Sequence, residues 1–117
     1  MKKVFYLKTC STCSKILKEL DLSSDFILQD IKSEAITTKH VETMEALAGS
    51  YEALFSKRAQ LYKQKDLKNK NLIESDYKNY ILEHYTFLRR PVFIIDDTIF
   101  IGNSKKTVEA VKTVLNK

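Results

Sequence analysis

The sequence has no tryptophan, one proline, two glycines and two cysteines among its 117 residues. So little glycine and proline excludes collagen-like and low-complexity chains. Apolar residues make up 44% of the chain, but no run of them approaches the roughly 20 residues that a membrane-spanning helix requires. A chain of this length buries well over half of the surface that its unfolded form exposes, so it can fold without disulfides or a structural metal. We therefore expect one domain, residues 1–117, whose cysteines are available for chemistry.

The amino-terminal stretch lacks the features of a secretory signal, because Lys8 ends the apolar run Val4–Leu7 and no small-residue cleavage pattern follows. We therefore predict a cytoplasmic protein with no membrane association. The formal net charge of +5 favours anionic partners. The densest basic stretch, Lys63–Lys70, is more simply interpreted as a solvated loop between helices than as a nucleic-acid footprint. We expect a monomer that makes no direct contact with nucleic acid.

The apolar pattern predicts two pairs of short strands, one pair near each end of the chain. The four strands are expected at residues 3–7, 26–28, 92–95 and 98–101. A helix over residues 13–22, with Ile16 and Leu20 on its apolar face, separates the first two strands, and such a unit of about 30 residues is typical of a parallel pair. The last two strands are joined by the short turn Asp96–Asp97, so they must be antiparallel.

Three helical regions accompany these strands. Ser11 or Thr12 is placed to cap the helix over residues 13–22. A terminal helix is expected over residues 104–115, where valines and a leucine fall on one face. The middle of the chain, residues 37–85, has apolar residues at helical spacings and is predicted to be an all-helical insert.

The boundaries of the insert are marked by local signals. Thr37 can cap its first helix, and Gly49 can end that helix. The flanking segments, residues 1–36 and 86–117, would then form an α/β core. We predict that this core is a mixed four-stranded sheet flanked by helices.

Cys10 and Cys13 lie where the first strand passes into the first helix, in the order Cys-Ser-Thr-Cys. A thiol at that junction lies beside the unsatisfied N–H groups of the first helical turn, which stabilise a thiolate and lower its pKa. We predict that Cys10 is the nucleophile. Cys13, three residues later, can attack a mixed disulfide formed on Cys10. The two cysteines would form a complete dithiol redox site.

Three alternative roles for the two cysteines are open. A zinc half-site uses cysteines at this spacing, but it needs two more ligands, and the chain offers only His40 and His84 with no ligand-like spacing. A structural disulfide is not typical of a cytoplasmic protein. Inert core thiols are less consistent with the polar neighbours of the pair. We expect both histidines to be surface residues of the insert, without a catalytic role.

Pro91 stands immediately before a predicted buried strand, where it cannot contribute a donor to the sheet and must form a turn or a cis bend. A bend here would bring the backbone before the strand alongside the dithiol. Arg90 precedes this proline, and its charge could hold an anion over the Cys10 thiolate or lower the pKa of Cys10 directly. We expect a function for Arg90, but treat Arg89 as the solvated end of a loop.

Three stretches together resemble the arsenate reductase (ArsC)/Spx family, whose members carry a helical insert within a thioredoxin-like fold. The stretches are Thr9–Lys15, Leu54–Tyr62, and Leu88–Val92 followed by Ile101–Asn103. The resemblance covers essentially the whole chain. It implies a thioredoxin-like core, with Cys10 at the family's catalytic cysteine position, Pro91 as its cis-proline and Arg90 as the arginine before that proline.

The resemblance also identifies departures from the arsenate reductases of the family. Those that depend on glutathione hold the oxyanion with three arginines, and here only Arg90 matches. Ser56 and Gly102 stand at the other two positions, with Arg58 as a candidate substitute for the first. An oxyanion needs several converging donors, so this pattern weighs against arsenate as the substrate. The Cys-x-x-Cys pair instead resembles the Spx branch, although Cys13 is followed by serine rather than by that branch's common arginine.

We therefore predict a cytoplasmic thiol–disulfide oxidoreductase of the ArsC-like family. The alternatives are an Spx-like redox-sensing regulator that binds RNA polymerase, and an arsenate reductase coupled to glutathione or thioredoxin. We expect no bound cofactor or metal, glutathione or thioredoxin as external reductant, and a small thiol, a disulfide or a redox partner protein as partner. The candidate catalytic residues are Cys10 and Cys13, and the candidate substrate-binding residues are Thr12, Arg58, Arg90 and Pro91.

Overall fold

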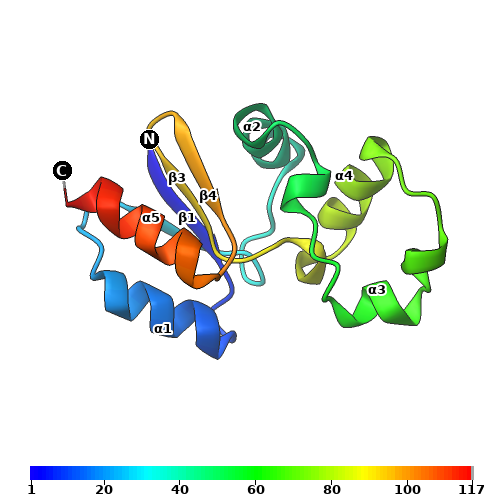
Figure 1. The fold of residues 1–117 in the computed structure, drawn as a ribbon, viewed down its shortest axis with the longest axis horizontal. Coiled ribbons are helices and arrows are strands. Elements are labelled where there is room, and N and C mark those ends of the chain that lie inside the picture. Colours follow the sequence, from blue (N-terminus) through cyan, green and yellow to red (C-terminus); the bar gives the residue numbers. More distant parts are fainter. Residues whose placement is uncertain (117) are drawn as a thin grey trace. The chain divides into compact units, whose positions relative to one another are not determined.

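The computed structural model describes residues 1–116 and divides into two compact units. The first, the sheet unit, comprises residues 1–34 together with the chain from Arg90 onward, and the second, the helical unit, comprises residues 35–89. Figure 1 shows that every strand belongs to the sheet unit. The helical unit is inserted between two segments of chain that build the same sheet.

The sheet unit contains a mixed four-stranded sheet in the order β2-β1-β3-β4. Its strands are β1 (Lys2–Tyr6), β2 (Ile27–Asp30), β3 (Val92–Ile95) and β4 (Thr98–Ile101). β1 pairs in parallel with β2 and antiparallel with β3, and β3 pairs antiparallel with β4. The sequence prediction of one parallel and one antiparallel pair is therefore confirmed. β1 and β3, which come from opposite ends of the chain, are the two central strands.

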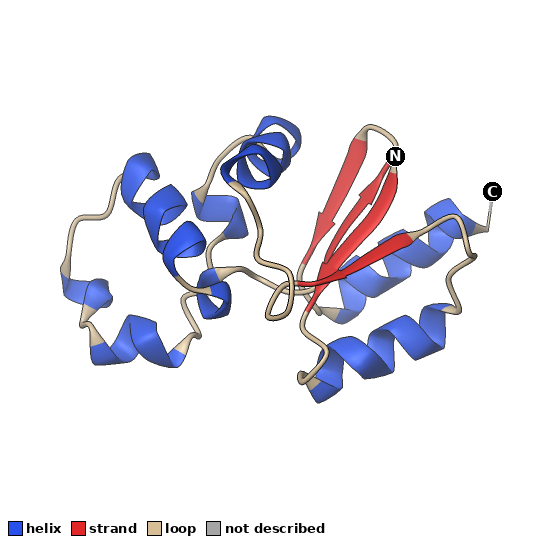
Figure 2. Ribbon diagram, turned by 180° about the vertical axis from the view of Figure 1, so that it is seen from behind, coloured by secondary structure: helices blue, strands red, loops and turns tan. Residues whose placement is uncertain are grey.

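Two helices, α1 (Ser11–Leu20) and α5 (Lys105–Leu115), lie side by side on one face of this sheet (Figures 1 and 2). Side chains from the central strands, from both helices and from the residue before β2 form the core between the sheet and the helices. This core consists of Val4, Ile16, Phe26, Phe93, Ile95, Val108 and Val111. Phe93 and Ile95 share a face because alternate residues of a strand point to the same side. The core therefore fixes the position of α1, and with it the cysteines at its start.

The first helix begins two residues earlier than the sequence pattern predicts. Cys10, with extended backbone angles, occupies the N-cap position, and its carbonyl accepts the first helical hydrogen bond from the Ser14 N–H at 3.1 Å. The expectation that Ser11 or Thr12 caps the helix is wrong, because both residues already lie inside its first turn. At the other end, Asp21 has a left-handed backbone (φ 48°) and terminates the helix.

The helical unit consists of short α-helices and 3₁₀ turns. They are α2 (Thr38–Ala48), η1 (Glu52–Leu54), α3 (Gln60–Gln64), η2 (Leu67–Asn69), α4 (Glu74–Glu83) and η3 (Tyr85–Phe87). Thr37 caps α2 as predicted, since its hydroxyl accepts from the His40 N–H and its own N–H donates to His40 Nδ1, each at 3.1 Å. Gly49 ends α2 with φ 95°, a left-handed conformation that favours glycine.

An aromatic cluster around Phe55 forms much of the interior of the helical unit. The Phe55 ring stacks on Phe87 with a centroid separation of 5.3 Å and meets the edge of Tyr77 at 4.9 Å. The segments around Phe55 and Phe87 also pair through their backbones, with the Ser56 N–H donating to the Phe87 carbonyl at 2.7 Å. Two stretches that are distant in the sequence are therefore neighbours in this unit.

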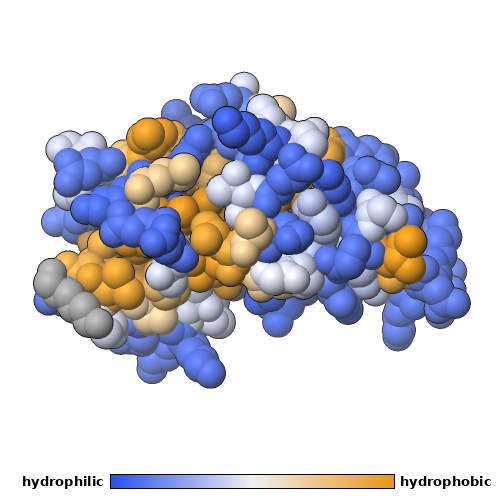
Figure 3. Space-filling view, turned by 90° about the horizontal axis from the view of Figure 1, so that it is seen from above, coloured by the Kyte–Doolittle hydropathy of each residue, from blue (hydrophilic) through white to orange (hydrophobic). Residues whose placement is uncertain are grey.

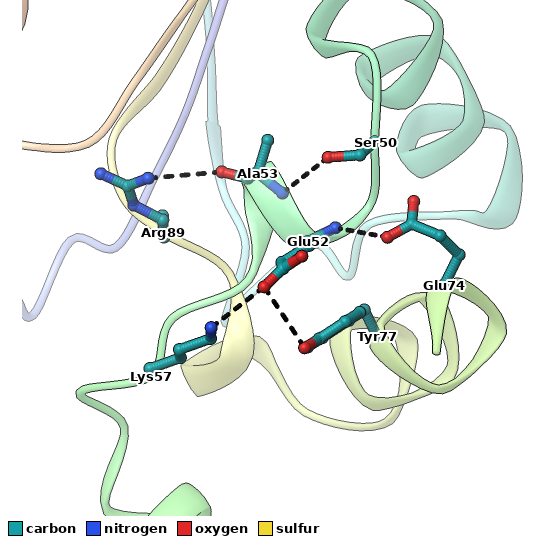
Figure 4. A network of polar contacts seen from close by, with 7 residues as sticks. All are labelled: Ser50, Glu52, Ala53, Lys57, Glu74, Tyr77 and Arg89. Carbon is teal, nitrogen blue, oxygen red and sulfur yellow. Dashed lines mark hydrogen bonds and ion pairs between the residues drawn. The ribbon is translucent and has the colours of Figure 1, made fainter. Parts of the chain in front are cut away.

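A polar network ties η1 to α4 and to the end of the helical unit (Figure 4). The Glu52 carboxylate pairs with Lys57 at 3.0 Å and accepts from the Tyr77 hydroxyl at 3.5 Å. The Glu74 carboxylate caps η1 by accepting from the Glu52 N–H at 3.2 Å. Arg89 is exposed and donates through Nη1 to the Ala53 carbonyl at 3.5 Å. These contacts give Arg89 a structural role within the unit.

The surface is uneven in polarity. Figure 3 shows apolar side chains reaching the surface of the sheet unit, whereas most of the visible surface of the helical unit is hydrophilic. On the edge strand β2, Ile27 and Leu28 are 60% and 50% exposed. No helix among residues 1–116 is long and apolar enough to cross a bilayer.

The core of the sheet unit gives a first prediction. Phe93 lies on a central strand and is fully buried, so Phe93→Ala should lower the free energy of unfolding by about 3–5 kcal/mol. Ile27→Ala removes an exposed side chain of the same sheet and should change it by no more than about 0.5 kcal/mol. Urea unfolding followed by circular dichroism measures both. Equal losses in the two variants would contradict the assigned core.

Candidate redox site

Cys10 and Cys13 meet at the start of α1, at the point where β1 ends and the chain turns into the helix. The turn is closed by a hydrogen bond of 2.9 Å from the Cys10 N–H to the Leu7 carbonyl. Cys10 is partly exposed, whereas Cys13 is only 1% exposed, and both are free thiols. The arrangement therefore offers one accessible sulfur and one buried sulfur within a single helical turn.

The environment of Cys10 favours its thiolate. Partial burial acts to raise the pKa of Cys10, but the hydrogen bonds that its sulfur receives lower that pKa below its ordinary value. These bonds come from the N–H and thiol of Cys13 and from the N–H of Thr12, and the positive charge of Arg90 adds to them. Backbone donors at a helix N-terminus stabilise an anion because no carbonyl of the helix uses them. The donors outweigh the burial, so Cys10 is the more acidic thiol.

Cys13 has the opposite character. Burial raises the pKa of Cys13 to about 11, and the neighbouring Cys10 contributes to the rise because the Cys13 thiol donates to that sulfur and a second negative charge beside it is unfavourable. Cys13 is therefore protonated near neutral pH and acts as a hydrogen-bond donor to the Cys10 thiolate. The Cys10 thiolate is therefore the sulfur that can attack a substrate, and the Cys13 thiol stabilises that thiolate.

Arg90 and Pro91 lie in the same unit as the two cysteines. The Arg90–Pro91 peptide bond is cis, which agrees with one of the two conformations expected from the sequence. Pro91 is buried, and its carbonyl accepts from the Gly102 N–H at 2.9 Å, which joins it to the loop after β4. The positive charge of Arg90 acts on both thiols and lowers the pKa of each.

Asp30, at the end of β2, anchors the loop that leads to Cys10. Its Oδ1 accepts the Lys8 N–H at 3.0 Å and its Oδ2 accepts the Ser33 hydroxyl at 2.7 Å. The Lys8 carbonyl in turn accepts the hydroxyl of Ser14, in the first turn of α1, at 3.3 Å. The Lys8 N–H, together with the Ser33 hydroxyl, lowers the pKa of the Asp30 carboxyl below its ordinary value. No sequence motif marks Asp30, because its partner is a backbone group 22 residues away.

The structure thus brings five of the six candidate site residues into one unit: Cys10, Thr12, Cys13, Arg90 and Pro91. The side chain of Thr12 is exposed on the first turn of α1. The sixth, Arg58, is exposed in the helical unit between η1 and α3, and its role in substrate binding stays a prediction.

Within residues 1–116, no three histidine, cysteine or carboxylate side chains are grouped so that they could hold a metal ion.

The sequence and fold are similar to those of known proteins. The ArsC family model matches residues 5–111. A Staphylococcus aureus protein shares 26% identity over 94% of this chain and 97% of its own, with a TM-score of 0.72. An ArsC-family-related protein from Bacteroides fragilis has 18% identity, coverage of 94% and 96%, and a TM-score of 0.76.

An arsenate reductase from Vibrio cholerae has 14% identity, with coverage of 95% of this chain and 97% of that chain, and a TM-score of 0.74. No curated protein matches the chain. The structural matches agree with the thioredoxin-like fold, a mixed four-stranded sheet with flanking helices, that the resemblance implies.

The hydrogen bond between the two thiols gives a second prediction. Cys13→Ala removes a donor to the Cys10 sulfur and should raise the pKa of Cys10 relative to the unsubstituted protein. Cys13→Ser keeps a donor at the same position and should raise it less. The pH dependence of Cys10 alkylation by iodoacetamide measures both values. If the alanine and serine variants gave the same pKa, the thiol donor would contribute nothing.

The anchoring carboxylate gives a third prediction. The folded state lowers the pKa of Asp30, so the unfolded state binds its proton more readily and the contribution of Asp30 to stability is present above its ordinary pKa of 3.8. It is lost as the pH falls through the lowered value. Asp30→Asn should therefore reduce stability at neutral pH and have a smaller effect in acid.

The matched control is Asp97→Asn, in the exposed turn between β3 and β4. Urea unfolding of both variants across the acid range makes the comparison. A difference from the unsubstituted protein that is independent of pH, or as large in the Asp97 variant, would exclude the anchoring role.

Proposed function

The chain belongs to the ArsC family, and from this membership we propose that it is a thiol–disulfide oxidoreductase that uses Cys10 and Cys13 as its dithiol. The observation that carries the proposal is the contrast between the two sulfurs. Cys10 is accessible and has a lowered pKa, whereas Cys13 is buried and has a pKa of about 11. A nucleophile that is ionised and exposed, with a protonated second thiol beside it, is what a two-step exchange requires.

In the first step, the Cys10 thiolate attacks one sulfur of a substrate disulfide. A new sulfur–sulfur bond forms between Cys10 and that half of the substrate, while the other half leaves as a thiolate with the electron pair of the broken bond and then takes a proton from water. The helix N–H groups that stabilise the Cys10 thiolate keep its concentration high before the attack. Arg90 supplies a positive charge near the reacting sulfurs.

In the second step, Cys13 loses its proton to the solvent or to the departing thiolate and attacks the Cys10 sulfur. The Cys10–Cys13 disulfide forms and the second half of the substrate leaves as a thiolate. The mixed disulfide no longer carries a negative charge on Cys10, so one of the causes that raise the pKa of Cys13 is removed and burial is the main one left. Ionisation of Cys13 is therefore easier at the moment when it is needed.

The net change is the transfer of two electrons from the dithiol to the substrate disulfide. An external pair of thiols must then reduce the Cys10–Cys13 disulfide, and glutathione or thioredoxin would supply it. The position of Cys13 within one turn of Cys10 favours an intramolecular second step over attack by an external thiol. We propose no bound cofactor for this cycle.

Arsenate is the second candidate substrate, supported by the positive charge of Arg90 at the Cys10 sulfur. Arsenate is an oxyanion with several acceptor oxygens, so its recognition needs more than one cationic or N–H donor. The helix N–H groups and Arg90 offer part of such a set in the sheet unit. A disulfide therefore fits the site better than arsenate does.

The proposed exchange gives a fourth prediction. With hydroxyethyl disulfide as substrate and thioredoxin or glutathione as reductant, Cys10→Ser should reduce turnover to the rate without protein, because the accessible thiol of the pair is gone. Cys13→Ser should still perform the first step and accumulate the Cys10 mixed disulfide, which intact-protein mass spectrometry detects. The same variants are assayed with arsenate. Turnover that survives Cys10→Ser would refute the enzymatic proposal, and absence of turnover with every substrate would favour the Spx-like alternative.

A further inference from the structure

A groove with a volume of about 660 Å³ runs between α1 and α5 in the sheet unit. The two helices lie side by side and run in the same direction, so their first turns meet at one end of the groove (Figure 1). Ser11 and Thr12 line that end, and they are the two residues that follow Cys10 in the chain. One end of the groove is therefore formed by the residues that directly follow the reactive cysteine, and the groove extends from there along the two helices.

The end of the groove near Cys10 is cationic. Lys15 of α1 and Lys105 of α5 both line it, and neither forms a salt bridge with any residue in the part of the chain that the structure describes. One turn further along, each helix contributes a glutamate, Glu19 and Glu109. Lys112 pairs with both glutamates, at 2.9 and 3.8 Å.

The pairing of Glu19 and Glu109 with Lys112 decides which charge is in excess in the groove. Lys112 offsets part of the charge of the two glutamates, while Lys15 and Lys105 form no salt bridge with a carboxylate of the described chain. With Lys112 included, the lysines exceed the glutamates by one positive charge, and the two lysines without a salt bridge lie toward the end that Ser11 and Thr12 line, where an anionic ligand would be attracted. The local charge is thus a property of the groove and not only of the overall basic composition.

The remaining lining residues fit a short aliphatic chain that ends in a carboxylate. Exposed hydroxyls of Ser11 and Thr12 and the exposed amide of Asn103 supply neutral hydrogen-bond donors at the cationic end. Ile16 and Val108, each only 7% exposed, form an apolar floor. A volume of about 660 Å³ is in the usual range for small-molecule sites, roughly 300–1,000 Å³.

We propose that this groove is the binding site for the carboxylate-bearing half of a small disulfide, which Lys15 and Lys105 hold while its sulfur faces Cys10. The inference rests on the proposed function and adds a substrate class to it: low-molecular-mass disulfides with anionic end groups. An acidic segment of a protein partner would be less well matched, because the groove is the size of a small molecule. Lys15 and Lys105 are specificity-determining residues in this scheme, and Cys10 remains the nucleophile.

The test uses three disulfides of similar size that differ in the charge of their end groups: dithiodipropionate, which is anionic, hydroxyethyl disulfide, which is neutral, and cystamine, which is cationic. The groove variant combines Lys15→Gln and Lys105→Gln. Its control combines Lys18→Gln and Lys106→Gln, which remove the same charge from exposed positions of the same two helices that do not line the groove. The second-order rate constant of the first step is measured for each protein and each disulfide at constant ionic strength.

We expect the groove variant to react about two- to thirtyfold more slowly with dithiodipropionate, which is the effect of losing two exposed ion pairs. Its rates with hydroxyethyl disulfide should be unchanged and those with cystamine unchanged or raised, and the control variant should match the unsubstituted protein throughout. A groove variant that slows all three disulfides equally, or none, would overturn the proposal while leaving the proposed exchange reaction intact. Failure of the unsubstituted protein to react with any of the three would instead overturn the proposed function.

Binding without reaction gives an independent measurement. S-methylglutathione carries carboxylates but has no thiol or disulfide to exchange, so its binding does not depend on turnover. Its addition should shift the amide resonances of Ser11, Thr12 and Lys105, and these shifts should be lost in the groove variant and kept in the control. Absence of shifts at these residues in the unsubstituted protein would count against the groove as a carboxylate site.

Discussion

The start of α1 is the constraint on which the chemistry of this protein depends. Cys10 is the N-cap of that helix, so the backbone N–H groups of the first turn, which the helix itself leaves unpaired, are directed at its sulfur. Hydrogen bonds to a charged group are worth more than those to a neutral one, roughly 1.5–3 kcal/mol, which is how a partly buried thiol becomes acidic rather than less acidic. The backbone at the start of the helix produces this effect together with two side chains, the Cys13 thiol and the charged Arg90.

The rest of the sheet unit keeps that helix end in place. The core between the sheet, α1 and α5 fixes the axis of the helix, and Asp30 fixes the backbone of the loop that enters it through Lys8. The burial that positions the helix also places Cys13 in the interior, where its thiol stays protonated. One packing arrangement therefore produces two thiols with opposite preferences, and the difference between them sets the order of the two proposed steps.

One lysine of the sheet unit, Lys112, has a specific structural role in addition to its contribution to the net charge. Most lysines are solvated and contribute to a general attraction for anions, but Lys112 pairs with the glutamates of both α1 and α5 and so joins the two helices that enclose the groove. This pairing offsets part of the charge of the carboxylates that line the groove, Glu19 and Glu109, and leaves Lys15 and Lys105 without a salt bridge in the described chain. The ion pair between Lys112 and Glu19, which joins the two helices, thus also changes the charge of the groove that a substrate would enter.

The amino-acid sequence by itself determined the elements and the reactive pair, because apolar periodicity and the position of Cys10 and Cys13 between a strand and a helix are local properties. It predicted the mixed sheet, since the helical connection favoured a parallel pair and the short Asp96–Asp97 turn required an antiparallel one. Only the tertiary structure decided that β1 and β3 are central strands, that Cys10 rather than Ser11 or Thr12 caps the helix, and that Asp30 holds the loop. It also decided that the Lys105 side chain lines the same groove as Lys15. These features arise from contacts between residues far apart in the chain, which no local pattern encodes.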